Sequence, residues 1–300
     1  MGIGKRLVQV EAPPGRQRDP PRKYSRKIVH ECKVNSWEEF EDQLRVLREQ
    51  RIGRKTQTPL HVSELLFRGQ RDHTWKLSTT LERQNKGQLT LRQYYRLISA
   101  ARPQIETLTE TLWTIPSYQE YEQWLRENEG PLPGDFPGYD YMVYLRHHGF
   151  PSPLLDWSRS PYVAAYFAFA HAASEADRVS IYVYWEYPGS GKVYSGNEPR
   201  IHGMGPYVRT HRRHFLQQSE YTICVVRDRE WQYAPHEAVF ARDDKSQDAL
   251  WKFDIPAGER LKVLKYLEEH NINAFSLFGS EESLMETIAL RELHLRDRGP

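Results

Sequence analysis

The first part of the chain that shows a hydrophobic pattern is predicted to be a helix followed by a buried strand. Residues 36–39 have the sequence of a capping box, in which a serine and a glutamate satisfy the first backbone N–H groups of a helix. Apolar residues follow at helical spacing, and Gly53 can end the helix. The apolar positions are Phe40, Leu44 and Leu47. Residues 60–67, which end in the apolar run Leu65, Leu66 and Phe67, are predicted to form a short buried strand ending at Arg68 and Gly69.

The central part of the chain is predicted to be mainly helical. Residues 90–127 have a helical pattern that is interrupted at residues 115–116, and a Pro- and Gly-rich loop follows over residues 131–138. Residues 139–148 form another predicted helix, which Gly149 ends.

A buried helix is then predicted to begin at Ser160 and Pro161. Serine is a favoured N-cap residue, and proline suits the first helical position. Residues 162–171 are almost entirely apolar, so this helix is expected to be buried. Leu155, Asp156 and Trp157 lie shortly before this helix in the sequence.

The C-terminal half alternates as strands do and then becomes helical again. Residues 178–187 place Val179, Ile181, Val183 and Trp185 on one face. After a Gly-rich loop over residues 189–205, strands are expected at 220–226 and 250–255, and helices at 258–270 and 281–293. The pattern predicts one α+β domain over residues 29–300, with an N-terminal helical part and a split, mostly antiparallel sheet flanked by helices.

Composition indicates a globular chain. Hydrophobic residues make up 39% of the 300 residues, and 8 Trp, 18 Tyr and 11 Phe are available to pack a core, which argues against disorder. No uninterrupted apolar run is long enough to span a membrane, and residues 1–6 do not begin a secretory signal. Cys32 and Cys224 form neither a disulfide framework nor a metal-ligand pattern, so a reducing, cytoplasmic setting is expected.

The charge of the chain is unevenly distributed. Residues 1–28 carry eight basic and two acidic residues, a net charge of +6, which leaves −4 on the rest of a chain whose formal charge is +2. This segment is also rich in proline and poor in apolar residues, so a flexible arm is expected. Two interpretations stay open: an electrostatic arm for nucleic acid, and a solubilising tail.

Three separate segments supply candidate site residues. Arg68 and Gly69, followed by Gln70, suit phosphate binding at the end of a strand, although Arg-Gly is also a common turn. In the second segment, Ser160 can cap the buried helix while Ser158 stands in a cleft and hydrogen-bonds a ligand or a carboxylate. Capping alone would also explain both serines.

The third segment contains Gln218 and Glu220. If residues 218–224 are extended, these two side chains point to the same face of a strand. The carboxylate could hold a ribose hydroxyl and stabilise an oxocarbenium-like cation, and the amide could orient an acceptor. The alternative is an edge strand with a polar face.

A further cluster contains His147 and His148. Adjacent histidines on a helix point about 100° apart, so they do not easily bind one ion. One histidine in a ligand pocket, or a helix end at which a histidine faces the dipole, is a better interpretation. A metal-dependent nuclease that uses both histidines and Asp156 is a rival hypothesis, which sensitivity to EDTA would favour.

Taken together, these segments resemble the FRG-domain family over roughly residues 60 to 290. The similar segments are residues 66–70, 75–77, 81–83, 146–151, 154–158, 160–168, 213–222 and 272–290. Their order also resembles the Arg–Ser–Glu class of ADP-ribosyltransferases, in which Arg-Gly, Ser-x-Ser and Gln-x-Glu follow one another on different strands. Arg159 stands between the serines, where that class usually has threonine.

This second resemblance implies an NAD-dependent mono-ADP-ribosyltransferase with no metal, of the kind used as a toxin or in defence against viruses that infect bacteria. Arg68 would anchor the NAD phosphates, Ser158 or Ser160 would support the nicotinamide ribose, Glu220 would be catalytic, and Gln218 would face the acceptor. The NAD pocket would also include Gly69, Gln70, His147, His148, Asp156 and Trp157. A macromolecular acceptor is expected, with DNA or RNA slightly favoured over protein. An NAD glycohydrolase and a nucleotide sensor without catalysis are the alternatives.

Overall fold

The structure, a computed structural model, describes residues 30–84, 89–128, 136–171, 175–195, 197–242, 244 and 246–296. The basic segment over residues 1–28 and most of the Pro- and Gly-rich loop over residues 131–138 therefore lie outside the described residues. In the described part, no helix is long and apolar enough to cross a membrane.

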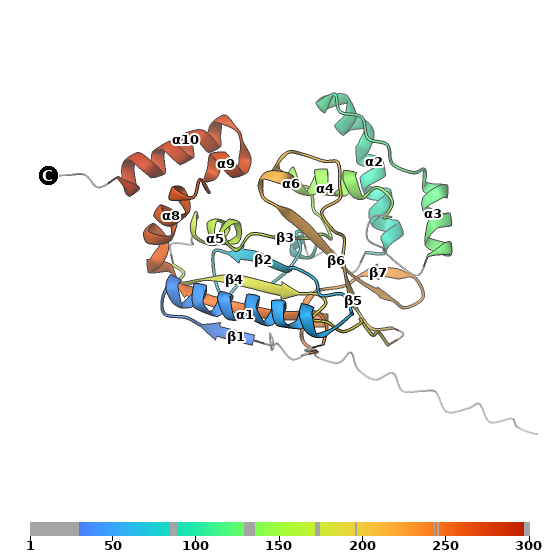
Figure 1. Cartoon of the computed structure of the whole chain (residues 1–300). Coiled ribbons are helices and arrows are strands. Elements are labelled where there is room, and N and C mark those ends of the chain that lie inside the picture. The colour runs from blue at the N-terminus through green and yellow to red at the C-terminus, as the bar shows by residue number, and fades with distance from the viewer. Residues whose placement is uncertain are drawn as a thin grey trace, which may run out of the picture.

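The fold is built on one eight-stranded sheet with the strand order β1-β8-β4-β2-β3-β6-β5, and β7 pairs with β6 (Figure 1). Only the β1–β8 pair is parallel; the other pairs are antiparallel. This confirms the predicted α+β class with a mostly antiparallel sheet. The strands are β1 (His30–Lys33), β2 (Leu65–Gln70), β3 (Leu155–Ser158), β4 (Arg178–Trp185), β5 (Arg200–Gly203), β6 (Ser219–Arg227), β7 (Trp231–Tyr233) and β8 (Ala249–Pro256).

The helices gather around this sheet, with α8 to α10 at one end of the molecule and α2 and α3 at the other (Figure 1). They are α1 (Trp37–Gln57), α2 (Leu91–Thr109), α3 (Tyr118–Glu127), α4 (Tyr139–His147), α5 (Pro161–Phe169), α6 (Arg213–Leu216), α7 (Glu237–Phe240), α8 (Arg260–Glu269), α9 (Ala274–Phe278) and α10 (Glu281–Leu290). Short 3-10 turns cover Glu82–Gln84 and Ala257–Glu259, and a π-helical turn covers Arg291–Leu295.

Three apolar clusters hold the layers together. One packs α1, α5 and α8 against the β2, β4 and β8 side chains, including Phe67, Ile181 and Phe253. A second packs α2, α3 and α4 against β6 and β7. The third lies among β2, β3, β4, β6 and α7 and includes Trp157 and Tyr184. Alternating side chains along each strand explain how a single sheet contributes to all three.

Several sequence-based boundaries are confirmed and others are wrong. The caps at Ser36 and Ser160 and the strands β4, β6 and β8 are confirmed. Gly53 does not end α1, which continues to Gln57, because a helix interior tolerates glycine at a cost of only about 1 kcal/mol. The strand expected at residues 60–67 instead covers Leu65–Gln70, so Arg68 and Gly69 lie within it.

Four strands were not predicted, and all of them are short. β1, β3, β5 and β7 have three or four residues each, too few for an alternating pattern to be recognised. β5 lies inside the segment that its glycines marked as a loop. β3 has the larger consequence, because it brings Asp156 and Ser158 into the middle of the sheet.

Candidate functional site

The sheet splits between β2 and β3. The two strands share a single residue pair, Phe67 with Ser158. Beyond it, β2 stays paired with β4 as far as Gln70, while β3 stays paired with β6 as far as Leu155. The strands therefore diverge, and a cavity of about 700 Å³ opens between their edges. Its volume lies within the range of about 300–1,000 Å³ that is usual for ligand pockets.

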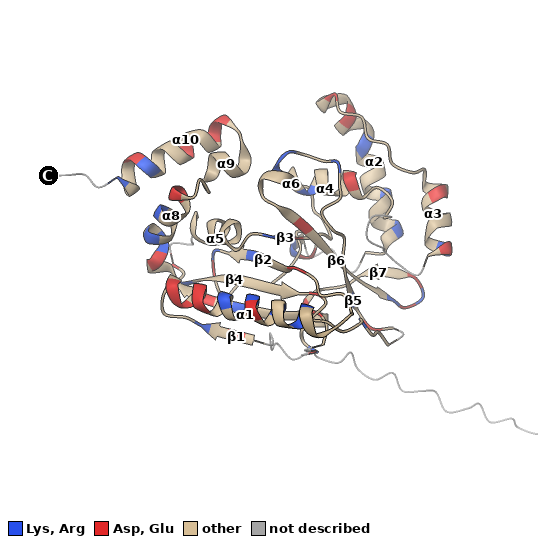
Figure 2. Cartoon of the chain, viewed as in Figure 1, with Lys and Arg blue, Asp and Glu red and all other residues tan. Residues whose placement is uncertain are grey.

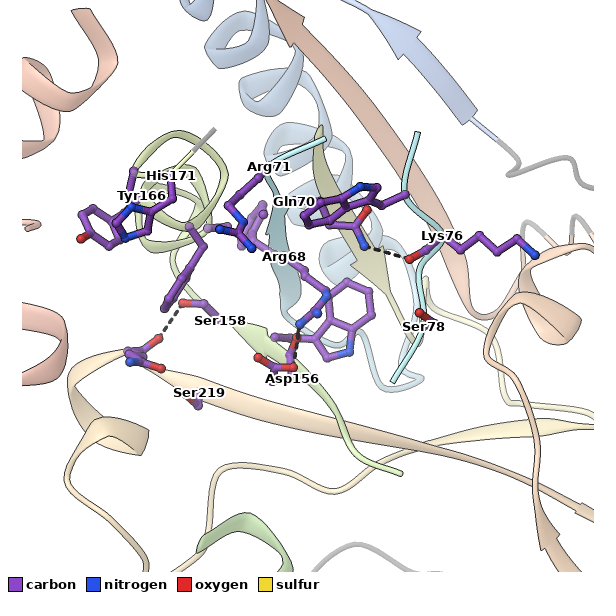
Figure 3. A pocket seen from close by; sticks show the side chains of 18 of the residues that line it. Arg68, Gln70, Arg71, Lys76, Ser78, Asp156, Ser158, Tyr166, His171 and Ser219 are labelled. Carbon is purple, nitrogen blue, oxygen red and sulfur yellow. Dashed lines mark hydrogen bonds and ion pairs between the residues drawn. The ribbon is translucent and has the colours of Figure 1, made fainter. Parts of the chain in front are cut away.

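An arginine bridges the split at its base. Nη1 of Arg68 on β2 donates to the carbonyl oxygen of Asp156 on β3 at 2.8 Å and to its carboxylate at 2.6 Å (Figure 3). The same carboxylate oxygen accepts from Nη2 of Arg146 on α4 at 2.7 Å. One carboxylate thus serves two guanidinium groups. Within the described residues, Nε of both arginines is buried without a hydrogen-bond partner.

The charge state of Asp156 follows from this contact. Burial acts to raise its pKa, but the guanidinium groups of Arg146 and Arg68 outweigh burial and hold the pKa well below its usual range. The side chain of Asp156 is 39% exposed, toward the cavity that it lines, so the carboxylate is not sealed in the core. Asp156 is therefore ionised at neutral pH, and the three groups together keep a net positive charge.

More cations line the cavity on the segment that follows β2. Arg71, Lys76 and Arg83 join Arg68 there, and Asp156 is the only acidic residue among the described lining residues. Figure 3 labels Arg68, Arg71 and Lys76. Burial, and next the positive charges of Arg68 and Arg146, lower the pKa of Arg83. An anion in the cavity would relieve this repulsion. The lining therefore favours a ligand that carries phosphate or carboxylate groups.

Aromatic side chains form the rest of the wall. Trp75 lies next to Arg71, whose guanidinium carbon is 5.4 Å from the centre of the indole ring. On the other side, α5 contributes Tyr166 and Phe167, and Phe278 of α9 packs edge-on against Phe167. The cavity thus combines cations with flat apolar surfaces, as a nucleotide-binding site requires.

Gly69 and Gln70 line the cavity, as expected for a site at the end of β2. Gly69 was predicted to let a ligand approach its backbone, but the structure shows that a helix approaches it. A Cβ atom at residue 69 would lie 1.9 Å from the carbonyl oxygen of Ala164, because α5 crosses directly over the strand. Gln70 is buried and donates from Nε2 to the carbonyl oxygen of Lys76 at 3.1 Å. It thereby positions the basic segment.

The Ser-x-Ser segment is only partly directed at the cavity. Ser158 lines it, but its hydroxyl already donates to the carbonyl oxygen of Gln217 at 2.8 Å and accepts from the backbone N–H of Ser160. Ser160 accepts from the N–H of Val163 as the N-cap of α5 and does not line the cavity. Trp157 lines it while its indole N–H donates to Thr222.

Glu220 lies on β6 opposite Trp157, one strand beyond the Ser158 strand. Its side chain is 18% exposed and lies 3.7 Å from Nε of Arg159. Burial raises its pKa, and Arg159 acts against that rise. Glu220 is not among the lining residues of the cavity, although the adjacent Ser219 is.

Gln218 does not share a strand face with Glu220, so this prediction is wrong. β6 begins at Ser219, and Gln218 has a φ of 48°, in the left-handed region. Its backbone closes the turn after α6, and its carbonyl oxygen accepts from the N–H of Arg159 at 2.9 Å. The exposed side chain of Gln218 lies outside the lining of the cavity.

The two adjacent histidines lie on α4 and do not line the cavity. Nε2 of His147 is 2.7 Å from the hydroxyl of Tyr221, and burial lowers the pKa of His147 to about 4. His148 caps the end of α4 and packs edge-on against His211. Among the described residues, no group of three or more His, Cys, Asp or Glu side chains could hold a metal ion.

Sequence reasoning missed several lining residues. Lys76 and Arg83 lie in segments similar to the FRG-domain family, and this similarity could have identified them. They were not predicted as site residues because a single cation in a loop does not by itself indicate a binding site. Tyr166 and Phe167 belonged to a helix interpreted only as core. Gln217 and Phe278 also lie in segments similar to that family, but they reach the cavity through tertiary contacts, and no role was assigned to them.

The fold and the site together define an α+β protein with a split sheet and a basic, aromatic-lined cavity in the split. Residues 63–177 match the FRG domain family. The match includes β2, β3 and α5, and so most of the cavity wall, whereas β6 with Glu220 lies outside it. Comparisons with curated proteins and with solved structures give no match.

Proposed function

We propose that the cavity binds NAD and that the protein transfers the ADP-ribose unit of NAD to an acceptor. The main support is the order of three adjacent strands. β2 carries Arg68, β3 carries Ser158, and β6 carries Glu220, and the cavity opens between the first two. Three segments that are far apart in the sequence, and that resemble the Arg–Ser–Glu pattern, thus come from neighbouring strands of one sheet.

Binding would be directed by the cations. The pyrophosphate of NAD would pair with Arg68, whose Nε has no partner within the described residues, and with Arg71 or Arg83. The planar rings of the ligand would lie against the aromatic walls that Trp75 and Tyr166 provide. Asp156 would act as a positioning residue, because it holds the guanidinium of Arg68 at the base of the split.

The chemistry would proceed at the anomeric carbon of the nicotinamide ribose. The bond from this carbon to the ring nitrogen breaks, and nicotinamide leaves as a neutral molecule with the electron pair. Glu220 would stabilise the oxocarbenium-like cation and hold a ribose hydroxyl. The acceptor nucleophile then forms a bond to the same carbon and loses its proton, which a carboxylate of raised pKa such as Glu220 is suited to accept.

Glu220 must reach the cavity for this reaction. It lies opposite Trp157, which does line the cavity, so the side chain of Glu220 is on the Trp157 face of the sheet and opposite to that of its neighbour Ser219. Its contact with Arg159 is long, at 3.7 Å, and Arg159 is 49% exposed. A surface contact of this kind is weak and would be easily exchanged for a ligand.

A second candidate function is a nucleotide-binding module without turnover. The position of Glu220 outside the cavity lining favours it, because the basic and aromatic walls bind a nucleotide equally well without that carboxylate. An NAD glycohydrolase, in which water is the acceptor, uses the same residues as the transferase. The basic segment over residues 1–28 favours a nucleic acid slightly as the acceptor of the transferase.

One experiment separates these functions. Purified protein is incubated with labelled NAD, alone and with DNA, RNA or cell lysate. Release of nicotinamide with the label appearing on a macromolecule supports the transferase, and release into water alone supports the glycohydrolase. NAD that binds and stays intact in every mixture would support the binding module and would contradict the transferase. Nuclease and protease digestion then identify the acceptor.

A further inference from the structure

A second, smaller cavity lies between the β6–β7 hairpin and the helices α2 and α3. Its volume is about 210 Å³. Four arginines line it, contributed by three separate parts of the chain. They are Arg92 of α2, Arg126 of α3, and Arg227 and Arg229 of the hairpin. The lining is completed by Leu125, Glu230 and Trp231. Figure 2 shows basic residues on α2 and at this hairpin.

The lining is basic, although carboxylates lie close by in the same elements: Asp228 stands between the two hairpin arginines, and Glu122 and Glu127 are near Arg126 on α3. Among the described lining residues Glu230 is the only acidic one, and it is bound to Arg92 at 3.1 Å. Arg92 also binds Glu122 at 2.8 Å. Within the described residues, Arg126, Arg227 and Arg229 form no ion pair with a carboxylate, and all three are exposed. Such clustered, unpaired arginines repel one another, and a bound anion would offset that repulsion.

One hairpin arginine, Arg227, packs against the ring of Trp231, as does Arg200 of β5. The guanidinium carbon of Arg227 lies 5.6 Å from the centre of the Trp231 ring, and that of Arg200 lies 4.4 Å from the same ring. The ring of Trp231 is only 6% exposed, so it serves as a platform for arginines and not as a surface on which a base could stack. The cavity is therefore suited to bind a negatively charged group and not a nucleic acid base.

The size of the cavity limits the ligand. At about 210 Å³ it lies below the range of about 300–1,000 Å³ in which whole small molecules bind, but it can take one tetrahedral oxyanion. Guanidinium groups pair with phosphate oxygens through two parallel hydrogen bonds. A single phosphate group of a larger molecule fits both the volume and the charge.

We infer that this cavity binds a backbone phosphate of a nucleic acid strand. Two features of the chain favour a nucleic acid over a phosphorylated protein: residues 1–28 add a net charge of +6, and exposed arginines from separate elements suit a repeating polyanion. The inference concerns binding only and does not depend on NAD turnover.

The test is the affinity of the full chain for a fluorescently labelled 20-nucleotide single-stranded RNA and DNA, measured by anisotropy without NAD at several salt concentrations. The variant is Arg227→Gln/Arg229→Gln. The matched control, Arg48→Gln/Lys55→Gln, removes two exposed cations from α1. Two lost charge-assisted hydrogen bonds weaken binding by more than about tenfold, and the slope of log affinity against log salt falls by about 0.7 for each lost phosphate contact.

Equal affinities for the variant, the control and the unchanged chain would overturn the inference. So would binding of a phosphoserine peptide, but not of either oligonucleotide, at this cavity. A second variant, Arg126→Gln/Arg229→Gln, leaves the contact between Arg227 and Trp231 in place and keeps the test valid if the first variant unfolds. Nicotinamide release without an acceptor should be the same in all of these chains, so a failure of the proposed enzymatic function would be seen separately.

Discussion

Arg68 and Asp156 join the two edges of the split sheet through one guanidinium nitrogen, which donates to both the backbone carbonyl and the carboxylate of Asp156. These strands would otherwise form a backbone ladder at this point. The side chain of Arg68 supplies hydrogen bonds to β3 where that ladder is absent. The same contact fixes the direction of a cation at the base of the cavity, so the proposed binding of NAD also depends on this residue pair.

The first prediction concerns Arg68. Arg68→Lys keeps the positive charge but removes the planar fork that can bind Asp156 and a phosphate together. We expect NAD affinity to fall by about tenfold or more, the effect of losing one charge-assisted hydrogen bond. Isothermal titration calorimetry measures this directly. Arg45→Lys, at an exposed position on α1, is the control and should bind as the unchanged chain does. Equal affinity for both variants would remove Arg68 from the binding site.

A second prediction follows from the crossing of α5 over β2. In Gly69→Ala, the added methyl group would lie 1.9 Å from the carbonyl oxygen of Ala164 and 2.7 Å from the backbone nitrogen of Ala168, so the helix must move. Overpacking of this kind lowers the free energy of unfolding by about 1–3 kcal/mol or more. Chemical denaturation measures the change.

Gly53→Ala provides the matched control for that experiment. Nothing lies within 4 Å of a Cβ atom at residue 53, and the residue is inside α1. Alanine should therefore stabilise the protein by about 0.5–1 kcal/mol. If both substitutions had the same effect on the free energy of unfolding, the close approach of α5 to Gly69 would be wrong.

The third prediction concerns acid stability. His236 is fully buried, with its Nε2 2.9 Å from the hydroxyl oxygen of Thr222. Burial, and next the charge of Arg68, lowers its pKa to about 3. The unfolded chain has an ordinary histidine pKa of about 6.5. Between these values only the unfolded state takes up the proton, so the stability contribution is complete above pH 6.5 and is lost as the pH falls toward 3.

This histidine should therefore make the free energy of unfolding fall by up to about 1.4 kcal/mol for each pH unit below 6. In His236→Gln the dependence on pH between 6 and 4 should be shallower by that amount. His61→Gln, at an exposed position, serves as the control and should retain the dependence of the unchanged chain. A variant at residue 236 with an unaltered slope would show that His236 does not titrate as its burial requires.

Local sequence signals predicted the helix caps and the longer strands. Ser36 and Ser160 cap their helices as expected, because a cap is a contact between residues three apart. The alternation of side chains along β4 could be recognised in the sequence because one face of the strand packs against α1 and α5. Short strands such as β3 gave no such signal, since four residues are too few for an alternation to be detected.

The sequence predicted part of the candidate site, and there are physical reasons why it could not predict the remaining residues. Arg68, Asp156 and Ser158 line one cavity because β2 and β3 meet at a single pair, a relationship that no local pattern contains. Gln218 was wrongly placed because a left-handed backbone at a non-glycine residue is rare and cannot be read from its neighbours. Phe278 reaches the cavity only through the packing of α9.

The central claim is that Glu220 on β6 acts on NAD bound in the cleft between β2 and β3, and it is tested most directly by comparing nicotinamide release in three proteins. They are the unchanged chain, Glu220→Gln and Glu49→Gln, the last being a control that changes an exposed glutamate on α1. Loss of one preorganised electrostatic group lowers turnover by about a hundredfold or more. We predict that loss for Glu220→Gln, with unchanged NAD affinity and thermal stability, and near-normal release for Glu49→Gln. Equal rates of nicotinamide release in all three proteins would contradict the claim.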